Sequence, residues 1–208
     1  METFTRITGV VVPLDRSNVD TDQIVPARYL KRIERQGWGD FLFYDWRYTD
    51  GSPNPSFVLN DERYSGAVAM VAGRNFGGGS SREHAVWAVR QYGIRAVIAP
   101  SFADIFHKNC FENGLVPVII TQEHVDTIMK KAQASPGYQL TVDLERGEVS
   151  DEEGFRAPFV VHEHPGTHEF RRQTLLNGLD EITLTLQQDQ RIAAFEANRP
   201  RWLTPAGP

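Results

Sequence analysis

One short segment, GRNFGGGSSREHA (residues 73–85), combines a glycine-rich stretch with residue types that can do chemistry. Four of its first seven positions are glycine, which leaves the backbone amides without side-chain cover, and Ser80, Ser81 and Arg82 follow directly. Amides, hydroxyls and a guanidinium together can bind an anion such as a phosphate or a carboxylate. The segment therefore predicts an anion-binding turn.

The glycine spacing argues against a nucleotide. A Walker loop requires a lysine directly before its serine or threonine, whereas Gly79 precedes Ser80 here. A dinucleotide loop requires G-x-G-x-x-G and an acidic residue about 20 positions later, and this segment does not have that spacing. We therefore interpret the turn as a site for carboxylates.

Ser80 has two interpretations from its local sequence. Ser80 and Glu83 form the S-x-x-E pattern of a capping box, in which the serine only caps the next helix. Alternatively, a serine at a helix N-terminus beside Arg82 lies in a positive field that favours proton transfer and attracts carboxylates. Because a free serine is a very weak acid, this second interpretation requires an electrophile or metal near the bound substrate.

Composition narrows the possible functions. The 208 residues are 40% hydrophobic and carry a formal net charge of −5 with interspersed signs, so we expect no nucleic acid and no membrane as partner. Cys110 is the only cysteine, which excludes an internal disulfide and a cysteine-ligated metal site built by this chain alone. No signal peptide or membrane-spanning stretch is visible, so we expect a cytoplasmic protein.

The elements that must position the glycine turn alternate regularly. They are strands at 67–73, 94–100 and 115–120, and helices at 82–93 and 101–114, the second opened by Ser101 and closed by Gly114. A β-α-β-α-β order of this kind is typical of a mostly parallel sheet with crossover helices.

Further elements flank this core. They are a strand at 7–14, an ordered aromatic insertion at 37–57, a helix at 121–134, a β-hairpin within 138–161 that turns near Arg146 and Gly147, and helices within 169–200 separated by a turn at Asn177 and Gly178. We predict one α/β domain spanning 1–208, with its core at about 5–125 and a C-terminal hairpin and helices at about 135–200.

GRNFGGGSSREHA and the following GIRAVIAPSFADIFHKNCFENGLVPV resemble the mobile swivel domain of the aconitase superfamily. With the flanks VVPLDRSNVDTDQIVPARYL, FLFYDWRY, PNPSFVLN and FRRQTLLNGLDEITLTLQ, the sequence is similar to the small subunits of 3-isopropylmalate dehydratases over nearly its whole length. The resemblance implies a swivelling β/β/α domain and a hydro-lyase of leucine biosynthesis that interconverts 2-isopropylmalate and 3-isopropylmalate. It also implies a large partner subunit, in a heterodimer or higher hetero-oligomer, which carries a [4Fe-4S] cluster, while the small subunit binds no cofactor itself.

The same resemblance implies roles for residues of the glycine turn. Ser80 corresponds to the base that abstracts and returns a proton, and Ser81 and Arg82 to positions that bind the substrate carboxylate and stabilise the developing carbanion. Asp22 corresponds to an active-site acidic position that orients the base or the substrate. Asp20 is the weaker candidate for that position.

Residues 29–32, YLKR, correspond to a flexible loop that helps select the side group of the substrate. Tyr29 and Leu30, together with Ile24, are candidates to line an apolar pocket for the isopropyl group. Lys31 and Arg32 are equally compatible with substrate binding and with solvated surface charges.

Other residue patterns allow simpler interpretations. The spacing of His162, His164 and His168 could suggest a metal site, but Pro165 and Gly166 interrupt it, so we interpret the histidines as exposed side chains of a loop. We interpret His84, Cys110 and the aromatic cluster as packing residues, with a partner interface as the alternative for the cluster, which comprises Trp38, Phe41, Phe43, Tyr44 and Trp46. Many of these small subunits have cysteine where Gly78 stands, whereas aconitases have glutamate there. Because the position varies across the superfamily, we expect its side chain to do no chemistry.

Two other functions remain open at this point. One is a small subunit of a related hydro-lyase, a homoaconitase or a citraconate-type hydratase. The other is a non-catalytic swivel domain that only binds anions. Activity with a cognate large subunit separates these alternatives.

Overall fold

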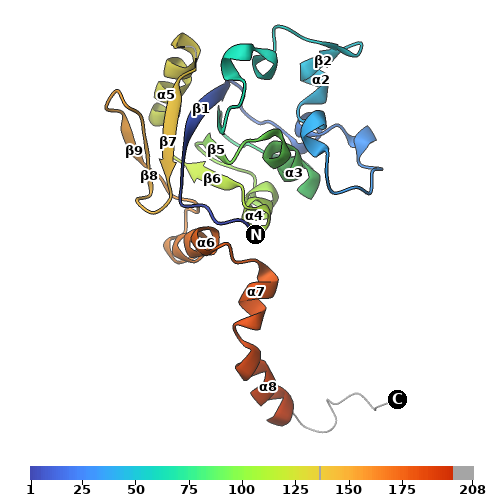
Figure 1. Cartoon of the computed structure of the whole chain (residues 1–208), viewed down its shortest axis with the longest axis vertical. Helices are drawn as coiled ribbons and strands as arrows, with labels where there is room; N and C mark the ends of the chain where they lie inside the picture. The colour runs from blue at the N-terminus through green and yellow to red at the C-terminus, as the bar shows by residue number, and fades with distance from the viewer. Residues whose placement is uncertain (136, 199–208) are drawn as a thin grey trace.

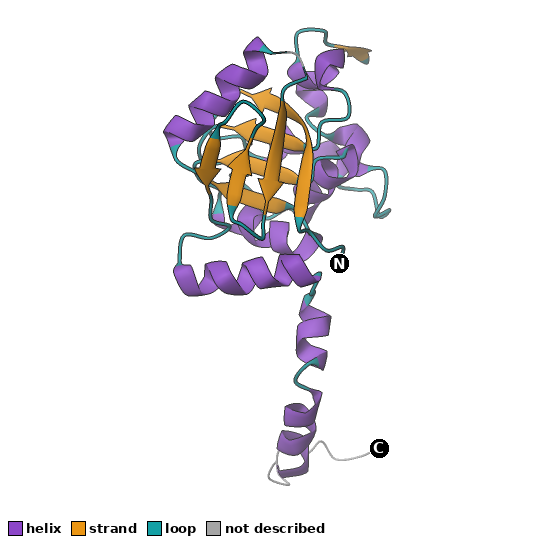
Figure 2. Cartoon of the chain, turned by 60° about the vertical axis from the view of Figure 1, so that its left-hand side comes forward, coloured by secondary structure: helices purple, strands orange, loops and turns teal. Residues whose placement is uncertain are grey.

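A seven-stranded sheet forms the centre of the molecule (Figure 2). The computed structural model describes residues 1–135 and 137–198. The sheet has the order β6-β5-β4-β1-β7-β8-β9. Its strands are β1 (Arg6–Leu14), β4 (Ala69–Ala72), β5 (Ala96–Ala99), β6 (Val116–Ile119), β7 (Gln139–Asp143), β8 (Glu148–Ser150) and β9 (Arg156–Pro158). Strands β1, β4, β5 and β6 are parallel, whereas β7, β8 and β9 continue the sheet in antiparallel fashion from β1. The predicted parallel core is confirmed, and the predicted hairpin extends it.

Helices cover both faces of the sheet. They are α3 (Glu83–Tyr92), α4 (Asp104–Asn113) and α5 (Gln122–Ala134). Side chains alternate between the faces of a strand, so neighbouring residues join different apolar clusters. Val12 and Met70 pack with the buried face of α3, whereas Val11 and Val71 pack with that of α5.

The longest connection runs from β1 to β4 and contains short elements. They are α1 (Thr21–Ile24), the 3-10 helices η1 (Ala27–Tyr29), η2 (Trp38–Phe41), η3 (Val58–Asn60) and η4 (Glu62–Tyr64), α2 (Tyr44–Arg47), and the strands β2 (Tyr48–Thr49) and β3 (Ser52–Pro53). Trp38 and Phe43 are fully buried, and Phe43 stacks on Trp46 with 5.3 Å between ring centroids. The predicted aromatic insertion is therefore ordered by its own packing.

The helix predicted at 82–93 is confirmed to within a residue, but the interpretation of Ser80 as its cap is wrong, and so is the predicted start of the next helix at Ser101. Both predicted helix ends are confirmed. Helix α3 begins at Glu83 after Arg82, whose side chain makes no capping hydrogen bond, so Ser80 does not cap it. Helix α4 begins at Asp104, and the hydroxyl of Ser101 instead accepts a hydrogen bond from the backbone of Asn75 at 3.0 Å. The Ser101 hydroxyl thus supports the glycine turn instead of capping α4, whereas the Ser80 hydroxyl caps no helix. Gly93 and Gly114 end the helices in left-handed conformations, as predicted.

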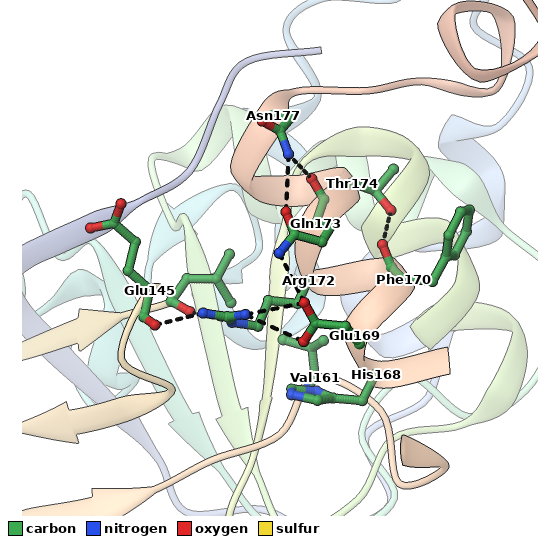
Figure 3. A network of polar contacts seen from close by, with 10 residues as sticks. Glu145, Val161, His168, Glu169, Phe170, Arg172, Gln173, Thr174 and Asn177 are labelled. Atoms are coloured by element: carbon green, nitrogen blue, oxygen red, sulfur yellow. Dashed lines mark hydrogen bonds and ion pairs between the residues drawn. The ribbon is translucent and has the colours of Figure 1, made fainter. Parts of the chain in front are cut away.

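The C-terminal part comprises α6 (Pro165–Asn177), α7 (Glu181–Leu186) and α8 (Asp189–Asn198). The Arg172 guanidinium fastens α6 to the turn between β7 and β8 by donating to the carbonyls of Leu144 at 2.8 Å and Glu145 at 2.6 Å (Figure 3). Gly178 makes the predicted turn, and α7 and α8 then extend away from the body (Figure 1). Positions 199 and 200 of the predicted helix lie outside the described residues. Within the described ranges, no helix combines the length and the apolarity that a bilayer crossing requires.

Candidate active site

The glycines of the turn allow close packing against neighbouring segments. A Cβ atom on Gly77 would lie 2.2 Å from the Phe106 ring, and one on Gly73 would lie 2.3 Å from the Ser17 hydroxyl. Gly77 and Gly79 also have φ angles of +84° and +89°, which side-chain-bearing residues rarely adopt. Gly78 differs, because a Cβ there would meet only the Asn75 amide at 3.9 Å. A side chain at position 78 can thus be accommodated without a clash.

The backbone amides of the turn are divided between two tasks. Those of Gly77 and Gly78 both donate to the Val19 carbonyl, at 2.7 and 3.0 Å. These two amides therefore hold the turn on the segment that follows β1 and are not available to an anion. The amides of Gly79, Ser80 and Ser81 donate to no group within residues 1–135 and 137–198. These three amides are available to an anion.

The segment that contains DTDQI lies directly against the turn. Thr21 donates its amide to the Gly78 carbonyl at 2.8 Å and its hydroxyl to the Ser80 carbonyl at 3.0 Å. Asp20 caps α1 by accepting from the Gln23 amide at 2.8 Å, while the Gln23 side chain accepts from the Asp20 amide. Asp20 is thereby engaged in local structure, and the role of Thr21 as a support for the serine turn is one that the sequence analysis missed.

Arg82 and Asp22 form an ion pair across 60 positions of sequence, with 2.5 Å between Nη1 of the arginine and Oδ1 of the aspartate. The Arg82 side chain is only 14% exposed, whereas that of Asp22 is 52% exposed. Nη1 also donates to the Val25 carbonyl at 3.5 Å. Asp22 therefore orients the guanidinium, and Nε and Nη2 have no hydrogen-bond partner among the described residues. Those two nitrogens can donate to a carboxylate in a bidentate manner.

Ser80 and Ser81 are both exposed, and neither hydroxyl has a hydrogen-bond partner in the described part of the chain. Because α3 begins only at Glu83, the expected position of Ser80 at the helix N-terminus is wrong. The field of the helix falls off within its first turn, so Arg82 and the amides of the turn supply most of the positive charge beside Ser80.

The first two residues of the segment 29–32 pack against the protein, whereas the last two are exposed to solvent. The Tyr29 ring lies 4.3 Å from that of Phe41, and Leu30 packs against the core. Lys31 and Arg32 are exposed, and Arg32 pairs with Glu34 at 3.4 Å.

The proposed apolar pocket loses one of its candidates. Ile24 is fully buried in the core and cannot line a pocket, so that expectation is wrong. The side chain faces inward because α1 packs its apolar side onto the core. Tyr29 follows Val25 by only four residues, and Val25 supplies the carbonyl that Arg82 contacts. The remaining candidates, Tyr29 and Leu30, are thus connected to the Arg82 pair by a short stretch of chain.

His84 and Cys110 are packing residues, as interpreted. The His84 ring lies 4.5 Å from Trp38 and 4.8 Å from Trp87, measured between centroids. Burial there lowers the pKa of His84, with a smaller opposing effect of Glu83. Cys110 is fully buried, and burial raises the pKa of its thiol, so it stays protonated.

The three C-terminal histidines are used in local structure. The predicted loop is wrong in its extent, because α6 begins at Pro165, where the missing N–H of proline costs nothing. His164 is the residue before this helix, and its amide donates to His162 Nδ1 at 3.0 Å. His168 lies within α6, and its Nδ1 accepts from the Val161 amide at 3.1 Å (Figure 3). These hydrogen bonds engage Nδ1 of His162 and of His168, whereas His164 contributes only its backbone amide. Among the described residues, no group of three or more His, Cys, Asp or Glu is arranged to hold a metal.

The sequence of this chain matches three protein families and several curated relatives. The aconitase C-terminal domain family matches residues 1–123 and the LeuD_N family matches 126–163. The family of C-terminal domains from small subunits of 3-isopropylmalate dehydratase matches 181–205. A 3-isopropylmalate dehydratase small subunit from Brevibacillus brevis is 54% identical over 200 residues, which are 96% of this chain and 100% of that protein. One from Koribacter versatilis is 52% identical over 197 residues, covering 94% of this chain and 98% of that protein.

A solved structure shares the fold. The crystal structure of 3-isopropylmalate dehydratase (leuD) from Methanocaldococcus jannaschii matches with a TM-score of 0.63 and 25% identity, covering 92% of this chain and 99% of that chain. The match to relatives along almost their entire length shows that this chain belongs to the 3-isopropylmalate dehydratase small subunit family of the aconitase superfamily.

Proposed function

We propose that this chain is the small subunit of a 3-isopropylmalate dehydratase, a hydro-lyase of leucine biosynthesis that acts together with a large subunit. The observation that carries the proposal is the exposed Ser80 on a glycine turn beside the Arg82–Asp22 pair. Family membership supports the same reaction, because the relatives carry that name. A cytoplasmic location stays a prediction.

In this proposal the turn handles the proton and the carboxylate. Ser80 Oγ, as the alkoxide, removes the proton from the carbon beside a carboxylate while the neighbouring carbon loses its hydroxyl group as hydroxide, which leaves a double bond between the two carbons. In the rehydration, hydroxide adds to one carbon of the double bond and the Ser80 hydroxyl returns its proton to the other, which restores the alkoxide. Arg82 Nε and Nη2, with the amides of Ser80 and Ser81, bind the carboxylate on which negative charge accumulates. Asp22 holds the guanidinium in position, so the donors are arranged before the substrate arrives.

The metal chemistry belongs to the other subunit in this proposal. The described residues contain no group of three or more His, Cys, Asp or Glu arranged to hold a metal, and Cys110 is buried in the core. The donor set of this chain therefore does not fit a [4Fe-4S] cluster. A cluster on the large subunit would supply the Lewis acid for the departing hydroxyl.

The decisive test is Ser80→Ala in the complex reconstituted with its large subunit. We expect kcat for isopropylmalate to fall by about 10²- to 10⁴-fold, because the proton-transfer group is lost. The melting temperature should stay unchanged, because the hydroxyl is exposed and supports no neighbour. Ser56→Ala, at another exposed serine, is the matched control and should keep full activity. Near-normal turnover of Ser80→Ala would show that Ser80 is not the base.

The same complex separates the alternative functions. Turnover on citraconate or homoaconitate that exceeds turnover on isopropylmalate would assign the chain to a related hydro-lyase. A chain that forms no complex with a cluster-bearing subunit and supports no turnover would be a non-catalytic anion-binding domain.

A further inference from the structure

The segment between η1 and η2 projects from the body and is held at only a few points. All its residues from Lys31 to Gly37 are exposed, and Ile33 is 94% exposed. At its start, the Arg32 amide donates to the Tyr29 carbonyl at 3.1 Å. Within the segment, the Arg32 guanidinium pairs with Glu34 at 3.4 Å and lies 5.0 Å from the Phe41 ring centroid, and that of Arg35 lies 5.9 Å from the Trp87 ring centroid. Because these contacts are made by exposed side chains and contribute little each, we expect the hydrogen-bonded anchors at the two ends to fix the conformation of segment 31–37.

The anchor at the far end is the Gln91 side chain on the last turn of α3. Its Oε1 accepts from the Trp38 amide at 2.9 Å, and its Nε2 donates to the Arg35 carbonyl at 2.7 Å. The Gln91 carboxamide therefore bridges the Arg35 carbonyl, within the segment, and the Trp38 amide, directly after it. Only glutamine or asparagine offers both a donor and an acceptor in such a planar group, and only glutamine has this reach.

Trp38 completes the anchor. Its indole nitrogen donates to the Glu34 carbonyl at 2.7 Å, and its ring is fully buried against His84 and Trp87 of α3. A Cβ atom on Gly39 would lie 2.7 Å from the backbone carbon of Gln91, so the backbone of η2 rests directly on the end of α3. These contacts hold segment 31–37 in a fixed position relative to α3.

Helix α3 therefore connects the segment to the serine turn. Its N-terminal end follows Ser80, Ser81 and Arg82, and its C-terminal end carries Gln91. An α-helix of this length is a rigid rod of about 15 Å. The position of segment 31–37 relative to the serine turn is consequently set by α3 and by the contacts that Gln91, Trp38 and Gly39 make with the segment and with this helix.

We propose that Gln91 is a positioning residue that holds segment 31–37, and with it Tyr29, Leu30, Lys31 and Arg32, in the conformation that recognises the side group of the substrate. This inference rests on the proposed function for its substrate, whereas the anchor itself stands on the contacts of Gln91 and Trp38. Gln91 makes no contact with the substrate in this role. Its loss lowers the population of the competent segment and raises the apparent KM by the same factor.

The test is Gln91→Met, which keeps the length of the side chain and removes both hydrogen bonds. Tyr92→Phe is the matched control, because it removes a 3.0 Å hydrogen bond to the Leu59 carbonyl from the same helix end without touching segment 31–37. In the reconstituted complex we expect the KM for isopropylmalate to rise about tenfold with kcat within about twofold in Gln91→Met. Gln91→Glu, which keeps the acceptor for Trp38 and loses the donor to Arg35, should show an intermediate KM.

Two further measurements distinguish positioning from a general structural role. The KM for the same hydroxy diacid with a methyl in place of the isopropyl group should stay within about twofold of the wild-type value, because little of the side group remains to be recognised. In the full-length chain, trypsin cleavage after Lys31, Arg32 and Arg35 should be about tenfold faster in Gln91→Met than in Tyr92→Phe, because cleavage follows the open population.

Each result decides one part of the inference. Unchanged cleavage in Gln91→Met would overturn the anchor, and faster cleavage with an unchanged KM would overturn its link to substrate recognition. A lower kcat with an unchanged KM would do the same. If the wild-type complex does not turn over isopropylmalate, the proposed function fails, while faster cleavage in Gln91→Met would still support the anchor.

Discussion

At the scale of single residues, neighbouring glycines of one turn have different physical roles. Gly77 combines a positive φ with contact against Phe106, whereas Gly78 has neither constraint. We expect Gly77→Ala to lower the free energy of unfolding by about 2–4 kcal/mol through overpacking and backbone strain. Gly78→Ala should raise it by about 0.4–1 kcal/mol, because alanine restricts the unfolded chain. Urea denaturation of both variants measures these changes, and equal effects would contradict the geometry of the turn.

The ion pair between Arg82 and Asp22 fixes the direction in which the guanidinium presents its remaining donors. A free guanidinium would bind any anion loosely, whereas one that is largely buried and held by a carboxylate and a carbonyl presents fixed donors. The Asp22 carboxylate thus neutralises part of the positive charge of Arg82 and in return fixes the orientation of the guanidinium. Such preorganisation is useful where a charge develops only during the reaction.

At the scale of elements, the packing of α4 against the segment after β9 makes stability depend on pH. The His107 ring lies 5.0 Å from Phe111, and its Nε2 is 2.7 Å from the Val161 carbonyl. Burial is the main cause that lowers the pKa of His107; His162 and Arg171 act in the same direction, and the Val161 carbonyl and Asp104 oppose them. The unfolded chain therefore binds a proton more readily than the folded one below about pH 6.5.

We accordingly expect the contribution of His107 to the free energy of unfolding to have its full value above about pH 6.5. This contribution should fall as the pH is lowered from there towards 5, because the unfolded chain then binds the proton more readily. Burial lowers the pKa of His84 and His168 as well, so all three act in the same direction. His107→Gln, which can still donate to Val161, should remove part of this dependence. Urea denaturation at several pH values measures the slope, and an equal slope in variant and wild type would exclude His107 as a source.

At the scale of the whole molecule, α7 and α8 extend away from the body (Figure 1). Both helices carry exposed apolar side chains. Ile182 is 73% exposed, Leu186 65% and Phe195 68%. Helices of six and ten residues gain most of their stability from packing, so a surface that covers them is expected. The large subunit is the partner that family membership indicates, and this part of the chain matches the family's own C-terminal domain.

We expect the double variant Ile182→Ser and Leu186→Ser to bind the large subunit at least about tenfold more weakly, because two buried apolar contacts are lost from the interface. The melting temperature of the isolated chain should not change, since both side chains are exposed in it. Gln190→Ser, an exposed polar position on the same extension, is the control. Titration calorimetry measures the affinity, and equal affinities would place the interface elsewhere.

The sequence by itself determined the alternation of strands and helices around the glycine turn, the buried aromatic insertion and the family. The first two features follow from short-range patterns, because side-chain periodicity and glycine preferences depend on local backbone geometry. The family followed from the resemblance of whole motifs to known small subunits. The positions of Ser80, Ser81, Arg82 and Asp22 in the candidate site were also visible as sequence motifs.

Only the tertiary structure decided how these residues are connected. It pairs Arg82 with Asp22, uses the amides of Gly77 and Gly78 to hold Val19, buries Ile24 and starts α3 after Arg82 instead of at Ser80. It also brings Gln91 to segment 31–37, which no local pattern indicates. The physical reason is that a hydrogen-bond partner is selected by which segments the sheet topology places side by side, and those segments lie tens of residues apart in sequence.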